Sequence, residues 1–222
     1  MTKNVEEDKP LADKLAATKK QLVEACNLLY ERGLVSGSGG NISIRADIGV
    51  VLITPTGLSF KALRPKEISV IDLRENLLEG KPPSMEASMH LKVLDTRPDI
   101  SVVCHCHGPY SVAASTLLSP GANSIPPLTP GFVYHAYPLY LLSFEVPGSS
   151  ELAEAVAKAL AKKGTKAVLL QNHGMVTVGK DLREAINIAE EIEEAAKIYL
   201  LTKGKGKILS DGHIAQIKKL GA

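Results

Sequence analysis

The chain has 222 residues, of which 45% are hydrophobic and 23% charged, the balance of a globular protein rather than of a disordered chain or a coiled-coil rod. Its 26 Lys and Arg against 24 Asp and Glu give a formal net charge of +2, and 4% of the residues are aromatic, with no Trp. This composition argues against a nucleic-acid partner, because such binding uses a clustered basic face and aromatic stacking surfaces.

The length of the chain limits the number of domains, and its apolar runs and cysteines indicate the cellular compartment. We expect one domain over residues 1–222, with a core at about 10–202 and a C-terminal tail, 203–222, that carries a short helix. No apolar run reaches the ~18 residues of a bilayer span, and no apolar signal core follows the polar start. We therefore expect no membrane partner. The cysteines (Cys26, Cys104 and Cys106) are few and odd in number, which favours a cytoplasmic protein.

Helices and strands are mixed along the chain. Apolar residues at helical spacing, closed by Gly33, predict a helix over 10–32. The β-branched and apolar runs predict strands at 41–45, 50–54, 68–73, 101–107, 132–137, 139–144, 167–171 and 175–179. Further helices are expected at 85–96, at 109–118, from Ser149–Ser150 to Gly164, from Asp181, and after Ser210. This order favours one α/β domain whose sheet is covered by helices.

The segment SVVCHCH (101–107) places two histidines and two cysteines in one predicted strand. Because alternate side chains of a strand point to opposite faces, His105 and His107 project from one face and Cys104 and Cys106 from the other. The two imidazoles can therefore reach a single cation, and the thiols cannot join them. The alternative is a pair of histidines near a strand end whose rings are satisfied by hydrogen bonds.

Three other residues are candidates to complete such a site, each with a simpler alternative. His173, in the turn NHG, is a third imidazole ligand or a turn histidine bonded to backbone. Glu86 follows Pro-Pro-Ser at a predicted helix start, where a carboxylate also pairs with the helix dipole. His90 shares the helical face of Glu86 and either orients that carboxylate or packs in the core, with packing favoured. His135 and His213 have no partner pattern.

Two loops could bind an anion. The sequence SGSGG (36–40) exposes backbone N–H groups that can cradle phosphate or carboxylate, although it matches neither the Walker pattern nor the dinucleotide-binding pattern. Thr56–Gly57 has an ordinary turn as its simplest interpretation. Each signal is weak when it is taken alone.

Five segments, in this order along the chain, together resemble the class II aldolase/adducin family, which includes L-fuculose-phosphate aldolases and ribulose-phosphate epimerases. They are SGSGGNISIR (36–45), ITPTG (53–57), PSMEASMHLKVLDTRPD (83–99), VVCHCH (102–107) and LLQNHGMVTVGKDLREAINIAEEIEEAAKIYL (169–200). The resemblance implies a three-layer α/β/α fold with a largely antiparallel central sheet, assembled as a homotetramer.

The resemblance also implies a set of site residues. His105, His107 and His173 look like the imidazole ligands of a divalent metal, Zn²⁺ first, with Mn²⁺ or Co²⁺ as alternatives. Glu86 is similar to the family's acid/base carboxylate, which can also ligate the metal. The positions that match the family's phosphate-binding residues are Gly40, Asn41, Thr56, Gly57 and Ser84.

The activity that the resemblance implies is that of a metal-dependent lyase. We expect an aldolase that cleaves a phosphorylated ketose through a metal-stabilised enediolate. The chain departs from the aldolases at Met85, where they have a second serine, and at IPPLTPGF (125–132), where it lacks their tyrosine. A decarboxylase of a sugar-acid phosphate or an aromatic acid, which would take a keto-acid substrate, is therefore the first alternative.

Two further alternatives remain. An epimerase would cleave and re-form the bond in the same metal site, and an adducin-like structural protein would have no activity. The presence of Glu86 together with His105, His107 and His173 favours catalysis, because a structural protein has no need of a complete ligand set.

Overall fold

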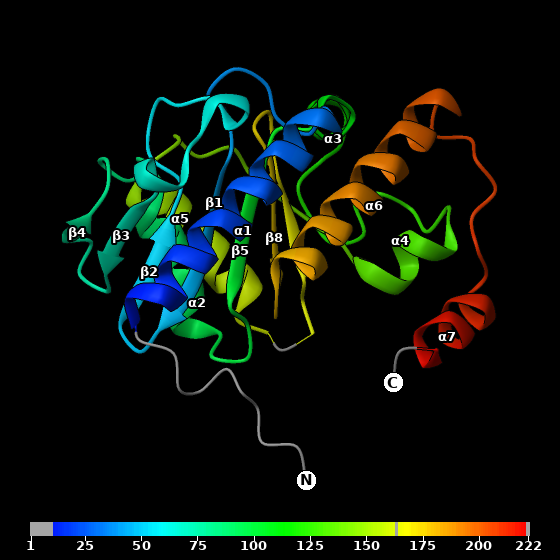
Figure 1. The fold of residues 1–222 in the computed structure, drawn as a ribbon. Helices are drawn as coiled ribbons and strands as arrows, with labels where there is room; N and C mark the ends of the chain where they lie inside the picture. Colours follow the sequence, from blue (N-terminus) through cyan, green and yellow to red (C-terminus); the bar gives the residue numbers. More distant parts are fainter. Residues whose placement is uncertain (1–10, 163, 221–222) are drawn as a thin grey trace, which may run out of the picture.

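The computed structural model describes residues 11–162 and 164–220, and an eight-stranded sheet runs through its centre (Figure 1). The strands follow the order β4-β3-β2-β1-β5-β8-β7-β6. All neighbours pair antiparallel except β6 and β7, which are parallel. The strands are β1 (Asn41–Asp47), β2 (Val50–Ile53), β3 (Ser69–Asp72), β4 (Leu77–Glu79), β5 (Val102–Cys106), β6 (Tyr140–Leu142), β7 (Ala167–Leu170) and β8 (Gly174–Gly179).

Helices cover both faces of this sheet, which confirms the predicted α/β/α fold with a largely antiparallel sheet. The helices are α1 (Leu11–Glu31), α2 (Ala87–Thr96), α3 (Pro109–Leu117), α4 (Pro130–His135), α5 (Ser150–Leu160), α6 (Leu182–Leu201) and α7 (Asp211–Lys219). In Figure 1, α1 and α6 lie in front of the sheet, and α2 and α5 lie behind it. Helix α7 packs against α4.

The alternation of β5 separates two hydrophobic cores. Cys104 and Cys106 lie in the core beneath α1 and α6, whereas Val103 lies in the core beneath α2 and α5. Residues directly opposite one another in an antiparallel pair share a face, so His105 and its β1 partner Asn41 lie on the α2 side. All three cysteines are buried and free. The predicted division between thiols and imidazoles is therefore confirmed.

One predicted element is wrong, and one strand was missed, as were two short 3₁₀ helices at Phe60–Ala62 and Pro65–Glu67. The apolar run 132–137, expected as a strand, lies in helix α4, because Pro130 starts the helix and the Thr129 hydroxyl accepts a hydrogen bond from the Phe132 N–H. Strand β4 was not predicted because its side chains are exposed and carry no alternating pattern. It pairs with β3 at the sheet edge.

Several element boundaries shift by a few residues. Helix α5 ends at Leu160 rather than at Gly164, and β6 covers three residues of the expected 139–144. The predicted caps are confirmed at two helices, since Asp181 accepts from the Glu184 N–H and Ser210 from the His213 N–H. Residue 10, the expected start of the first helix, lies outside the described residues.

Within 11–162 and 164–220, no helix combines the length and hydrophobicity that crossing a membrane requires.

Candidate metal centre

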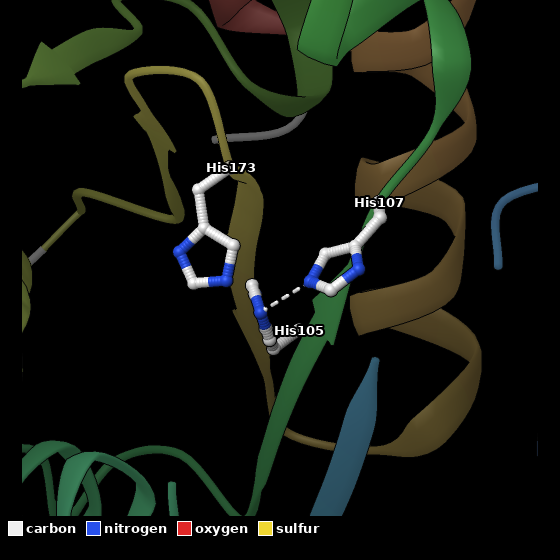
Figure 2. Close-up of side chains that lie close together, drawn as sticks. All are labelled: His105, His107 and His173. Carbon is white, nitrogen blue, oxygen red and sulfur yellow. Dashed lines mark hydrogen bonds between the residues drawn. The ribbon is translucent and has the colours of Figure 1, made fainter. Parts of the chain in front are cut away.

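Three imidazoles from two neighbouring parts of the sheet point toward one another (Figure 2). His105 lies in β5, His107 follows its last residue, and His173 lies in the short turn between β7 and β8. Because β5 pairs with β8, with Cys106 opposite Met175, the end of β5 meets this turn. One nitrogen from each ring falls within 4.8 Å of the other two.

The turn that carries His173 is determined by local backbone chemistry. Asn172 has a φ of 57°, in the left-handed region that asparagine tolerates better than most residues. Its N–H is held by the Ser115 hydroxyl of α3 at 3.0 Å. The reversal therefore directs His173 toward the end of β5, as the sequence NHG suggested.

The orientation of His105 follows from a backbone hydrogen bond. Its Nδ1 lies 2.9 Å from the carbonyl oxygen of Met175, which can only accept, so Nδ1 carries the proton. The Nε2 atom then has a free lone pair, and it lies 2.8 Å from the Nε2 of His107. This is the arrangement of a metal-binding histidine whose far nitrogen is held by the protein.

Glu86 approaches the histidines from the start of α2, on the same side of the sheet as His105. It is the N-cap of α2, but its side chain makes no capping bond, so the helix-dipole alternative does not describe its contacts. Its Oε2 lies 3.3 Å from His105 Nε2, and its Oε1 lies 3.8 Å from His173 Nε2. The carboxylate is 5% exposed. The structure thus brings Glu86 beside all three histidines.

Burial keeps the imidazoles neutral. It lowers the pKa of His105 well below the usual value, and the nearby rings of His107 and His173 add to this effect. Burial likewise lowers the pKa values of His107 and His173. Neutral rings present lone pairs, which is the form that binds metal ions.

One unpartnered atom tests whether a cation fits this cluster. Glu86 Oε1 is buried without a hydrogen-bond partner among the described residues, and it lies 3.8 Å from His173 Nε2. A buried carboxylate oxygen without a donor is costly, and a cation beside it removes that cost. Three imidazole nitrogens with an adjacent carboxylate are a common donor set for a divalent transition-metal ion. The residues present therefore fit such an ion.

Two glycines for which the sequence predicts no contact with a histidine make room for His107. A Cβ on Gly39 would lie 2.8 Å from His107 Nδ1, and a Cβ on Gly174 would lie 2.8 Å from His107 Cδ2 and would also collide with the Cys106 carbonyl. The ring therefore lies between two glycines. The sequence signal was the presence of these glycines in SGSGG and NHG, but their contact with one ring depends on the folded arrangement.

The positions that match the family's phosphate-binding residues have different contacts near this cluster. Gly40 has a φ of 77°, and a Cβ there would lie 2.9 Å from the His105 carbonyl oxygen, so glycine is required where β1 approaches β5. Ser84 is buried, and its hydroxyl accepts from the Glu86 N–H. A bridge between Pro55 and Pro83 brings the turn at Thr56 and Gly57 beside Ser84.

Asn41, also matched to phosphate binding, has both ends of its side-chain amide engaged. Its Nδ2 donates to Glu86 Oε2 at 2.8 Å, and its Oδ1 lies 2.5 Å from His90 Nε2. His90 is fully buried, as the favoured packing interpretation requires, yet both of its ring nitrogens have polar partners. No pattern in the sequence predicts the contact of Asn41 with either residue.

The other two histidines lie apart from the cluster. His135, in α4, stacks edge-on against Tyr134 with ring centroids 4.7 Å apart. His213 is exposed on α7. Neither belongs to the three-histidine group.

Fold and site together define a protein class. The model of the Class II Aldolase and Adducin N-terminal domain matches residues 20–200, so the chain belongs to this family. Class II aldolases depend on a divalent metal ion, and the three histidines form a cluster that could hold one.

Individual relatives include lyases of two kinds. The chain is 38% identical over 209 residues to a 3-oxo-tetronate 4-phosphate decarboxylase of Haemophilus influenzae, covering 92% of this chain and 98% of the relative. It is 38% identical over 186 residues to an L-fuculose phosphate aldolase of Methanococcus maripaludis, covering 83% and 98%. The crystal structure of YgbL from Escherichia coli superposes with a TM-score of 0.87 at 31% identity, covering 92% of this chain and 99% of that chain.

Proposed function

We propose that this chain is a metal-dependent carbon–carbon lyase that decarboxylates a phosphorylated 3-oxo sugar acid. The observation that carries the proposal is the convergence of Glu86 with His105, His107 and His173. The substrate class comes from the decarboxylase relative, which is matched over nearly its whole length. The sequence alone favoured the aldolase, which is the second candidate.

Both candidate reactions share one chemical problem. A bond next to a ketone breaks, and its electron pair is left on the carbon and oxygen atoms of an enediolate. Decarboxylation releases carbon dioxide from a carboxylate that has already lost its proton, whereas aldol cleavage must also take a proton from the hydroxyl that becomes the aldehyde. In residues 11–162 and 164–220, no tyrosine makes a hydrogen bond to Glu86 or to the three histidines. This favours the reaction with fewer proton transfers.

In this proposal each polar group has one task. His105, His107 and His173 hold a divalent ion, for which three imidazoles favour Zn²⁺, with Mn²⁺ and Co²⁺ as alternatives. Such an ion supplies positive charge where negative charge develops on the substrate oxygens. Glu86 in its protonated form gives a proton to the carbon that has lost carbon dioxide, and water restores that proton. Burial of the carboxylate excludes bulk water from this transfer.

The phosphate of the substrate needs a site away from the reacting carbon. We assign it to backbone and hydroxyl groups at Gly40, Thr56, Gly57 and Ser84, since Ser84 bonds the Glu86 N–H and the Pro55–Pro83 bridge brings the Thr56–Gly57 turn beside Ser84. The amide of Asn41 already bonds Glu86 and His90, so this phosphate site does not depend on it. Binding energy from the phosphate would orient the reacting bond. The homotetramer and the cytoplasmic compartment stay predictions.

A comparison of two substrates tests this function. Purified protein with added Zn²⁺, Mn²⁺ or Co²⁺ is given 3-oxo-tetronate 4-phosphate or L-fuculose 1-phosphate, and carbon dioxide and aldehyde are measured separately. We expect carbon dioxide from the first substrate, and loss of that activity in Glu86→Gln but not in His135→Ala. Aldehyde release alone would favour the aldolase, and isomerisation without cleavage the epimerase. No turnover of a metal-loaded protein would favour the non-catalytic alternative.

A further inference from the structure

A chain of buried polar side chains starts at Glu86 Oε2, the oxygen that also lies 3.3 Å from His105 Nε2. Asn41 Nδ2 donates to Glu86 Oε2 at 2.8 Å, Asn41 Oδ1 lies 2.5 Å from His90 Nε2, and His90 Nδ1 lies 2.7 Å from the Ser43 hydroxyl. All four residues are at most 5% exposed. Asn41 and Ser43 are two residues apart on β1 and share a face, and His90 lies one helical turn after Glu86 on α2.

The direction of every hydrogen bond in this chain can be assigned. A carboxylate only accepts, so the amide nitrogen of Asn41 must face Glu86, and its oxygen must face His90. That oxygen also only accepts, so His90 carries its proton on Nε2. His90 Nδ1 then accepts from the Ser43 hydroxyl. Burial lowers the pKa of His90 to about 3, which agrees with a neutral ring carrying one proton.

The two oxygens of Glu86 are consequently different. Oε2 is held through Asn41, whereas Oε1 is buried without a hydrogen-bond partner among the described residues. If the Asn41 amide turned over, its carbonyl would face the carboxylate, and two acceptors would repel. The N–H of His90 opposes that rotation because it would then face the amide nitrogen, a donor. In its Nε2–H form, His90 therefore stabilises the orientation in which the amide nitrogen of Asn41 reaches Glu86.

We propose that His90 is a positioning residue for Glu86: it fixes the Asn41 amide, which holds Oε2 and leaves Oε1 as the oxygen that exchanges a proton with the substrate. This inference rests on the proposed function, in which Glu86 carries the proton. It gives His90 a role through Asn41, without contact with substrate. Partners that orient a functional group from behind typically change activity by about tenfold to a hundredfold when they are removed.

Two amide substitutions of His90 form a matched test. In His90→Gln the side-chain amide reaches the position of Nε2 and can donate to Asn41, whereas in His90→Asn it is too short. We expect His90→Asn to lose about tenfold or more in kcat with little change in KM or metal content, and His90→Gln to retain most of the native kcat. A purely structural role predicts equal losses in the two variants, since both replace a fully buried ring. Equal kcat values in the two variants would overturn the inference.

A second measurement does not depend on activity or on any substitution. Long-range ¹⁵N–¹H correlation spectra of the full chain report which ring nitrogen of His90 carries the proton. We expect the Nε2–H form, and the Nδ1–H form would contradict the assigned chain of donors.

The failure of the proposed function and the failure of the inference about His90 give different results. If the native protein is inactive on all substrates, the proposed function fails. If native protein is active and Glu86→Gln inactive, but His90→Asn matches His90→Gln, only the role of His90 fails.

Discussion

The two faces of β5 have the same backbone and opposite chemistry. On one face, Cys104 and Cys106 are buried with leucines of α1 and isoleucines of α6, and the contacts are apolar. On the other face, His105 lies opposite Asn41 of β1 and beside Glu86 of α2, and the contacts are polar. Two buried atoms without a hydrogen-bond partner within the described part of the chain, Glu86 Oε1 and His173 Nδ1, belong to side chains on this second face.

This difference shows how one strand serves stability and chemistry separately. The thiol face is satisfied by packing alone, so a change there should act on the free energy of unfolding. The imidazole face retains unsatisfied groups at a cost in stability, as expected for a site that binds a ligand. Substitutions on the two faces should therefore have separable effects.

The largest effect is expected for His107→Ala, which removes an imidazole between the two glycines. Metal binding and lyase activity should both be lost, because the cluster then keeps only two of its three imidazole ligands. Metal per chain is measured by mass spectrometry after dialysis. His135→Ala is the matched control, since His135 lies in α4 outside the cluster, and it should keep its metal. Unchanged metal content in His107→Ala would remove His107 from the ligand set.

Glu86→Gln should separate metal binding from catalysis on the imidazole face. The amide keeps the size of the side chain but cannot carry the proton, so activity should fall by about 10²–10⁴-fold while the metal stays bound. Steady-state kinetics and metal analysis on the same sample check this. If the variant turned over substrate at the native rate, the proton carrier would have to be another residue.

The next effect is expected from Gly174→Ala, which crowds the imidazole face without removing a ligand. The added Cβ would meet the His107 ring and the Cys106 carbonyl, so metal affinity should fall by about tenfold. Competition with a chelator measures the affinity. Gly212→Ala on the exposed α7 is the control, because its Cβ meets no atom closer than 3.8 Å. Equal affinities in the two variants would show that the space beside His107 is not required.

The contrast between the faces could be predicted from the sequence because it needs only the two-residue period of a strand. The contacts of Asn41 with Glu86 and His90 could not, since they depend on β1 lying beside β5 and on where α2 crosses the sheet. The same holds for Gly39, whose partner His107 is far along the chain. Helix α4 was mistaken for a strand because an apolar run of six residues fits either period, and the Thr129–Pro130 start was the deciding signal.

The smallest effect on the site is expected for Cys104→Ser on the thiol face. The serine hydroxyl would be buried among apolar side chains, which costs about 1–3 kcal/mol of unfolding free energy, measured by denaturant titration. Cys26→Ser, in α1 of the same core, should cost a similar amount. Metal content and kcat should not change in either variant, because both side chains point away from the histidines. Loss of metal in Cys104→Ser would mean that the two faces of β5 are coupled, and the separation of stability from chemistry along this strand would fail.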